Sequence, residues 1–185
     1  RPGDLPAGNK KVLVIGGGFG AMQVIDILLH DNSVQLVGYV DDDSMKKENK
    51  IFNVPFVGST NDIEKLFKAK YFTHAIISIS INIQVRESLF NDCRKIGIPF
   101  VNAICPSVRI NRNTVLGTGN IICSNVHIGV CSILKDNNFI SSNATIEHHN
   151  IIGSHNTWGP SFNTSSRVKI GNNNKFGINI SMQPV

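Results

Sequence analysis

The second half of the chain carries a large apolar residue at every sixth position. Steps of six from Ile110 to Met182 give thirteen positions, and all but Thr164 are large and apolar: Ile110, Leu116, Ile122, Ile128, Leu134, Ile140, Ile146, Ile152, Trp158, Ile170, Phe176 and Met182. A helix repeats its apolar positions every 3.6 residues and a strand every two, so neither keeps this phase. The pattern predicts a left-handed parallel β-helix, in which each side of a triangular coil takes one hexapeptide with its apolar residue inside.

The residues around the apolar positions predict the corners of this prism. Glycine follows the apolar residue at 117, 129, 153, 159, 171 and 177, and Asn or a small residue often lies two positions before it. Gly and Asn tolerate a positive φ, so we expect them to occupy the tight corners. Since three hexapeptides make one coil, residues 110–182 are expected to form about four coils.

The first half alternates short apolar runs with helix-like segments. We predict strands at 11–15, 34–40, 75–79 and 99–102, and helices over 22–29, 61–69 and 83–96. Strands that alternate with helices imply a small parallel, Rossmann-like sheet, with its ligand cleft at the carboxyl ends of the strands. We therefore expect an α/β domain over 10–102 and a β-helix domain over 106–185, with a linker near 102–108.

The first predicted strand runs into a glycine-rich turn. Gly16, Gly18 and Ala21 follow the G-x-G-x-x-A spacing that lets a backbone approach a pyrophosphate at a helix N-terminus. Asp41 follows the second strand, where its carboxylate can accept a hydrogen bond from a ribose hydroxyl. Together these features predict nucleotide binding. The alternative is a tight strand-to-helix turn, with the acids Asp41 to Asp43 capping a loop.

Composition and charge narrow the function classes. The 185 residues are 41% hydrophobic and 17% charged, as in an ordinary globular protein, and the net charge is +5. The basic residues are scattered, which suits an anionic small ligand and argues against nucleic acid. The four cysteines form no C-x-x-C pair and no zinc spacing, so we expect free thiols in a reducing cytoplasm. No apolar run reaches the roughly 18 to 20 residues of a membrane span, so no membrane partner is expected.

Two adjacent histidines follow an acid in the β-helix half, in Glu147-His148-His149. Counted from the inward-facing Ile146, the histidines fall two and three positions later, outside the prism and near a corner. Solvent or a neighbouring subunit can reach them there. Three histidines on such a scaffold can instead bind zinc, as in the β-helical carbonic anhydrases. No histidine here has another five residues on, so we expect no metal.

A Rossmann-like half with this glycine turn and an Asp-Asp strand end, joined to hexapeptide repeats, resembles the bacterial sugar acetyltransferases of surface-polysaccharide biosynthesis. These include the acetyltransferases of the bacillosamine, perosamine and sialic-acid pathways. The resemblance covers nearly the whole chain after Lys10. Its most specific stretch is 144–153, Ala-Thr-Ile-Glu-His-His-Asn-Ile-Ile-Gly, which is similar to the family's Ile-Glu-His-acid-x-x-Ile-Gly.

This resemblance implies an acetyl-CoA-dependent acetyltransferase that acts on the amine or hydroxyl of a nucleotide-activated amino sugar, with a UDP-amino sugar favoured. It implies a homotrimer with each active site between two prisms. It also implies a catalytic base, His148, beside Glu147 and His149. The implied acetyl-CoA contacts are Thr157, Ser166 (as oxyanion donor) and Ile178, and the implied sugar-nucleotide contacts are Gly16, Gly18, Gly20, Asp41 and Asp42.

Three departures from the family pattern leave alternatives open. The family's acid after the histidine is His149 here, and its histidine in the glycine turn is Gly20. The family also continues for several hexapeptides and a tail over coenzyme A, which predicts a C-terminally truncated β-helix in this chain. A non-catalytic sugar-nucleotide-binding relative is therefore the alternative function. An NAD-dependent oxidoreductase is disfavoured, because the first domain is only half a dinucleotide fold.

Overall fold

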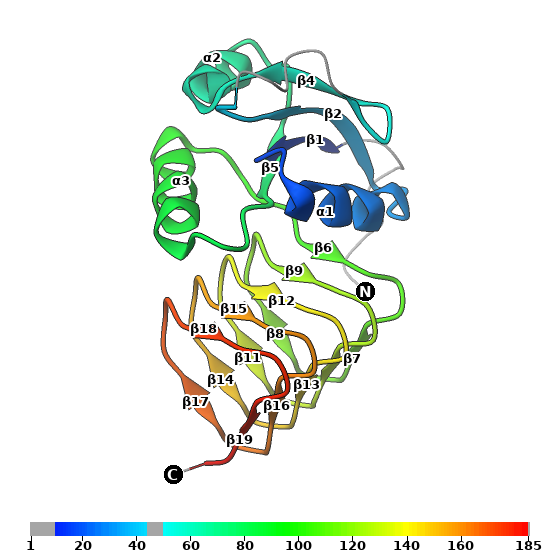
Figure 1. The fold of residues 1–185 in the computed structure, drawn as a ribbon, viewed down its shortest axis with the longest axis vertical. Helices are drawn as coiled ribbons and strands as arrows, with labels where there is room; N and C mark the ends of the chain where they lie inside the picture. Colours follow the sequence, from blue (N-terminus) through cyan, green and yellow to red (C-terminus); the bar gives the residue numbers. More distant parts are fainter. Residues whose placement is uncertain (1–9, 44–49, 185) are drawn as a thin grey trace. The chain divides into compact units, whose positions relative to one another are not determined.

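The computed structural model describes residues 10–43 and 50–184 (Figure 1). Two compact units make up the chain. One runs to Ile79 and includes Leu89–Val101, and the other comprises Ser80–Ser88 and the chain from Asn102 onward. The sequence-based boundaries, 10–102 and 106–185, assign Ser80–Ser88 differently. Among the described residues, no helix is long and apolar enough to cross a membrane.

A five-stranded sheet of order β3-β4-β2-β1-β5 forms the first unit. Its strands are β1 (Lys10–Ile15), β2 (Val34–Val40), β3 (Lys50–Ile51), β4 (Val54–Gly58) and β5 (His74–Ile77). The helices of this half of the chain are α1 (Phe19–Leu29), α2 (Ile63–Lys68), preceded by the 3-10 turn η2 (Thr60–Asp62), and α3 (Ile83–Ile96). β1 pairs in parallel with β2 and β5, and β2 pairs in parallel with β4, whereas β3 runs antiparallel to β4. The sheet is thus mixed at one edge and parallel elsewhere.

Most elements predicted for this half are present, and the differences have local causes. The predicted strand at 99–102 is wrong, since only a single bridge between Ala75 and Phe100 forms there. β3 and β4 were not predicted because their segment contains Asn53, Pro55 and Gly58, which are typical of turns. Phe52 and Asn53 both have positive φ and turn the chain back, which makes β3 antiparallel.

Fourteen two-residue strands build the second unit. They are β6 (Ala103–Ile104), β7 (Arg109–Ile110), β8 (Val115–Leu116), β9 (Ile121–Ile122), β10 (His127–Ile128), β11 (Ile133–Leu134), β12 (Phe139–Ile140), β13 (Thr145–Ile146), β14 (Ile151–Ile152), β15 (Thr157–Trp158), β16 (Asn163–Thr164), β17 (Lys169–Ile170), β18 (Lys175–Phe176) and β19 (Ser181–Met182). They form three parallel sheets, here called the first face (β7, β10, β13, β16, β19), the second face (β8, β11, β14, β17) and the third face (β6, β9, β12, β15, β18). This arrangement confirms the left-handed parallel β-helix (Figure 1).

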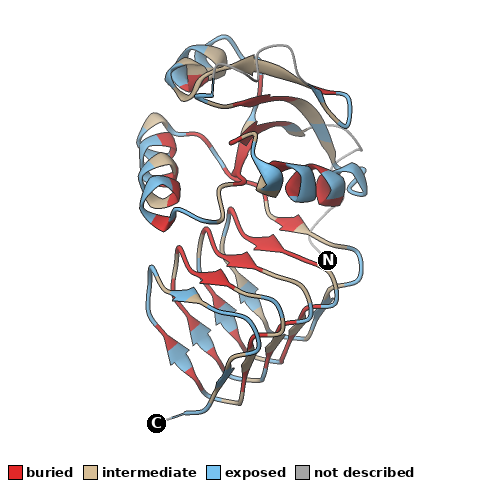
Figure 2. Ribbon diagram, viewed as in Figure 1, coloured by how far each residue is buried: buried red, intermediate tan, exposed pale blue. Residues whose placement is uncertain are grey.

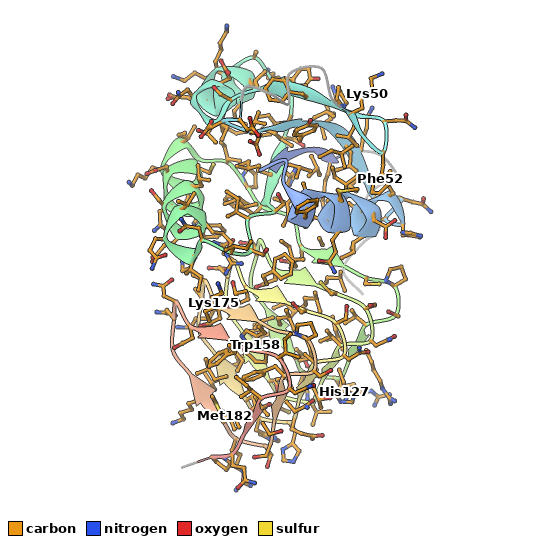
Figure 3. The ribbon with its side chains drawn as sticks, in the orientation of Figure 1. Lys50, Phe52, His127, Trp158, Lys175 and Met182 are labelled. Atoms are coloured by element: carbon orange, nitrogen blue, oxygen red, sulfur yellow. The ribbon has the colours of Figure 1, made fainter. Side chains whose placement is uncertain are left out.

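The six-step residues fill the interior of the prism, as predicted. From Ile122 to Ile170 none of them is more than 7% exposed. Trp158 of this series is labelled in Figure 3. Its ring centroid lies 4.4 Å from that of Phe162 and 5.9 Å from that of Phe176. Ile110 is 38% exposed, because its strand is the last of its sheet and has a neighbour on one side only. The series also starts earlier than expected: β6, in the predicted linker, pairs with β9.

The glycines after the inward residues do not form the corners, and that prediction is wrong. The left-handed residues lie three positions after the inward residue: Asn113, Gly119, Asn125, Cys131, Asn137, Asn143, His149, His155, Ser161, Arg167, Asn173 and Asn179. The glycines are needed because consecutive coils stack closely. A Cβ on Gly153 or Gly159 would lie 2.5 Å from a backbone carbonyl oxygen, that of Gly171 or Gly177 respectively.

The asparagines two positions before the inward residues are also not corners. Asn120, Asn138, Asn156 and Asn174 stack one above another, 18 residues apart. The Oδ1 atom of each accepts hydrogen bonds from the side-chain amide and the backbone N–H of the next, at 2.9 to 3.1 Å. This ladder satisfies polar groups that the prism buries.

The segment Ser80–Ser88 is attached to the third face of the prism. Arg86, only 1% exposed, donates from Nη2 to the carbonyl oxygen of Asn156 at 2.8 Å. The hydroxyl of Thr157 donates to the carbonyl oxygen of Ser80 at 3.2 Å. Burial lowers the pKa of Arg86 to about 10. These contacts explain why a segment that precedes the prism in sequence belongs to it.

Candidate functional site

The corner between the first and second faces carries Glu147, His148 and His149 outside the prism. It follows β13 and precedes β14. His149 has φ of 61° and turns the chain. Buried Asn150 closes the corner, since its side-chain amide donates to the carbonyl oxygen of Glu147 and to the hydroxyl of Thr164, both at 2.7 Å. The corner is therefore held from inside, with its ionisable side chains outside.

The two imidazoles of this corner contact each other. Nδ1 of His148 lies 3.0 Å from Nδ1 of His149, and the rings meet edge to face, with centroids 5.1 Å apart and an interplanar angle of 89°. His148 is half-buried, whereas His149 and Glu147 are exposed. Among the described residues, no hydrogen bond joins the carboxylate of Glu147 to either ring. The side chain in contact with the His148 ring is therefore the imidazole of His149, and not the carboxylate of Glu147.

The adjacent coils pack directly against this corner. A Cβ on Gly129, in the preceding coil, would lie 2.6 Å from the backbone nitrogen of His148. In the following coil, the N–H of Arg167 donates to the carbonyl oxygen of His148 at 3.1 Å. Ser166, the predicted oxyanion donor, lies next to Arg167 and is half-buried. The structure thus brings Ser166 into the same corner as His148, one coil on.

The other two predicted acetyl-CoA contacts do not lie beside His148 within one chain. Thr157 is on the third face, 9% exposed, and covered by Ser80. Ile178 is 67% exposed at the corner after β18, between the third and first faces. Their roles toward acetyl-CoA remain predictions that need a neighbouring prism.

The glycine turn of the first unit is held by side chains that the sequence analysis did not single out. Gly16 has φ of 101°, and a Cβ there would lie 2.8 Å from Oγ of Ser78. That hydroxyl donates to the carbonyl oxygen of Gly16 at 3.0 Å. A Cβ on Gly17 would lie 2.6 Å from the ring of Tyr39, whereas Gly18, at the N-terminus of α1, has nothing within 4 Å. Gly18 is therefore the open position of the turn. Gly20 lies in the first turn of α1.

Both predicted acids accept hydrogen bonds from the protein itself. Oδ2 of Asp41 accepts from the N–H of Gly17 at 2.5 Å, which ties the end of β2 to the glycine turn. Asp42 accepts from the N–H of Thr60 at 2.8 Å and from its hydroxyl at 2.9 Å. Asp41 thus positions the turn, and its role toward a ribose remains a prediction.

The cysteines are all free thiols: Cys93, Cys105, Cys123 and Cys131. Burial raises the pKa of Cys123 to about 12 and that of Cys93 to about 11. Over 10–43 and 50–184, no group of three or more His, Cys, Asp or Glu residues is placed to hold a metal ion.

Comparison with known proteins supports both halves of this description. Residues 11–93 match the family model of the PglD N-terminal domain. No curated protein matches the chain significantly. PerB from Caulobacter crescentus, solved with CoA and GDP-perosamine, is 23% identical with a TM-score of 0.80, and the alignment covers 98% of this chain and 94% of PerB.

Two further solved structures are similar. For the acetyltransferase domain of PglB from Neisseria gonorrhoeae FA1090, in complex with acetyl coenzyme A, the identity is 16% and the TM-score 0.77, over 95% of this chain and 94% of that one. For WeeI from Acinetobacter baumannii AYE the values are 16% and 0.52, over 89% and 95%. These similarities confirm the predicted fold.

Proposed function

We propose that this protein transfers the acetyl group of acetyl-CoA to a nucleotide-activated amino sugar. The observation that carries the proposal is the position of His148, half-buried on the outer corner of a β-helix of the PerB and PglB type. PerB was solved with CoA and GDP-perosamine, and the PglB domain with acetyl coenzyme A. The glycine turn, with Gly18 open at the N-terminus of α1, supports the nucleotide part of the proposal.

In the proposed reaction, His148 acts as the general base. Its imidazole takes a proton from the sugar amine as the nitrogen attacks the thioester carbonyl, and a C–N bond forms. A backbone N–H at Ser166 stabilises the oxyanion of the tetrahedral intermediate. The intermediate then collapses, the C–S bond breaks, and the departing thiolate of coenzyme A takes the proton from His148.

A homotrimer is part of this proposal. The second face carries an outward ladder of apolar residues on neighbouring strands: Val115, Ile133 and Ile151 are 58%, 38% and 41% exposed. In β11, β14 and β17 the exposed residue is followed by a buried one (Figure 2). A contiguous exposed apolar surface is typical of an interface between subunits. His148 lies at the edge of this face, so a neighbouring prism would border it and supply residues such as Ile178.

For the acceptor we propose a UDP-amino sugar, with a GDP-linked sugar as the alternative, since PerB was solved with GDP-perosamine. We also propose that the protein works in the cytoplasm, where its four free thiols stay reduced.

The second candidate function is sugar-nucleotide binding without catalysis. It is favoured by the absence of a carboxylate directly after His148 and by Gly20 in place of the family's histidine.

Thiol release from acetyl-CoA tests the proposal. The assay uses a panel of UDP-, GDP-, dTDP- and CMP-linked amino sugars, and we expect release with at least one. A thermal-shift panel with the same sugars separates the candidates, because a ligand at 100 times its Kd stabilises a protein by about 2.7 kcal/mol. Stabilisation by a sugar nucleotide without thiol release from any of them would favour the non-catalytic function.

A further inference from the structure

We propose that His149 positions His148 for catalysis, as a neutral imidazole that accepts a hydrogen bond from Nδ1–H of His148. The proposal rests on the proposed function for the role of His148 as base. More commonly, a carboxylate accepts the hydrogen bond from Nδ1–H of a catalytic histidine. Here a second histidine takes that role. In this reaction His149 is a positioning residue and does not touch the substrate.

The geometry of the pair fixes how many protons it holds. Two imidazole nitrogens 3.0 Å apart are at hydrogen-bond distance, so one must donate and the other must accept. In the neutral pair, the contact between Nδ1 of His148 and Nδ1 of His149 therefore contains a single proton. With both nitrogens protonated, the contact would place two N–H groups against each other with no acceptor between them.

The direction of this hydrogen bond follows from the proposed reaction. Since Nδ1 of His148 faces His149, only Nε2 is left to take the proton of the sugar amine. A lone pair on Nε2 requires the proton of neutral His148 to be on Nδ1. Nδ1 of His149 must then be the acceptor, with its own proton on Nε2, where exposure lets it donate to water. The opposite direction would protonate Nε2 of His148 and abolish its basicity.

The fold itself holds His149 in place. Its left-handed φ of 61° is shared by Cys131 one coil before and Arg167 one coil after, at 60° and 63°. The corner backbone is thus set by the β-helix and not by the histidine pair. Cys131 and Arg167 occupy the same position as His149 in the neighbouring coils, and neither offers a carboxylate. Glu147 lies on the same corner, but among the described residues its carboxylate makes no hydrogen bond to either ring. His149 is therefore the acceptor in contact with Nδ1 of His148.

Side-chain NMR of the full chain labelled with ¹⁵N-histidine tests the tautomers without any turnover. Near pH 8 we expect His148 protonated at Nδ1. In His149→Gly, which removes the acceptor and keeps a residue suited to a left-handed backbone, His148 should revert to the Nε2–H form that an isolated imidazole prefers. The control is Ser161→Gly, the same kind of change at a φ of 58° in another column of corners, and it should leave the spectrum of His148 unchanged. Finding His148 protonated at Nε2 in the unaltered protein would overturn the proposal.

Kinetics supply an independent test. In His149→Gly we expect kcat to fall about tenfold or more, because the base is misoriented. KM for acetyl-CoA should change less than about twofold, because the binding of acetyl-CoA is not affected. His149→Asp, which supplies an acceptor, should recover kcat. An unchanged kcat in His149→Gly would contradict the proposal. If no sugar is acetylated at all, the proposed function fails, and the NMR experiment still decides the tautomers of the pair.

Discussion

Gly129 lies directly against the backbone of His148. A Cβ added to Gly129 would lie 2.6 Å from the nitrogen of His148 and 2.7 Å from the carbonyl carbon of Glu147. The two coils are also joined by the N–H of Gly129, which donates to the carbonyl oxygen of Ile146 at 2.7 Å. A residue one coil away therefore sets how close the candidate catalytic corner lies to the rest of the prism.

Gly129→Ala should destabilise the protein by roughly 1 to 3 kcal/mol, because the added methyl group must push two hydrogen-bonded coils apart. Gly171→Ala is the matched control, since nothing lies within 4 Å of a Cβ at Gly171. Its effect should stay within about 0.5 kcal/mol. Urea unfolding measures both, and equal stabilities for the two variants would contradict the close stacking of coils.

Trp158→Ala should cost roughly 3 to 5 kcal/mol, because it leaves a cavity among the aromatic rings of the prism interior. Trp158 is fully buried and packs against Phe162 and Phe176. Ile178→Ala serves as the control, since Ile178 is 67% exposed and should contribute little. The same unfolding experiment applies, and a loss below about 1 kcal/mol for Trp158→Ala would be inconsistent with this core.

The double variant Ile133→Glu, Ile151→Glu should break the proposed trimer, because it would bury carboxylates at the centre of an apolar interface. Light scattering should give three times the chain mass of 20.2 kDa for the unaltered protein and a single chain mass for the variant. Lys68→Glu, on α2 of the first unit, makes a similar charge change at a residue that is not part of this face, and it should stay trimeric. A monomeric unaltered protein at micromolar concentration would refute the assembly.

Thiol alkylation should separate the cysteines by burial. Thiolates form only as the pH approaches the pKa, and burial raises the pKa of Cys93 to about 11 and that of Cys123 to about 12. At pH 8 no more than about one in a thousand of these thiols is ionised. Iodoacetamide followed by mass spectrometry should therefore modify the half-exposed Cys105 and Cys131 first, and all four cysteines in urea. If Cys123 were labelled as fast as Cys131 in the folded protein, the predicted protection of Cys123 by burial would be wrong.

The β-helix could be predicted because the same six-residue pattern recurs in every coil. Each inward position must be apolar, so Ile122, Ile128 and the rest of the series repeat at a fixed interval. The structural reason for glycine after the inward residue could not be predicted from this pattern. A side chain at Gly129 is excluded by the backbone nitrogen of His148 in the next coil. How closely two coils stack cannot be predicted from the sequence.

The candidate site was predictable to the same extent. Counting from Ile146 placed His148 and His149 outside the prism, because position within a hexapeptide determines direction. The contacts of Asp41 with Gly17 and of Thr157 with Ser80 depend instead on tertiary packing. For the contact of Asp41, the sequence offered one clue, a third glycine inside the turn. This residue, Gly17, has no room for a side chain beneath Tyr39.

The central claim is that His148 is the base of an acetyl transfer, and its replacement by alanine tests this most directly. The variant His148→Ala should keep its fold, with a stability change within about 0.5 kcal/mol, because the side chain lies outside the prism. The control His30→Ala removes an exposed imidazole at the end of α1 and should keep full activity. Thiol release from acetyl-CoA with the preferred amino sugar should fall roughly 10²- to 10⁴-fold in His148→Ala. Retention of most of the activity by this variant would contradict the account.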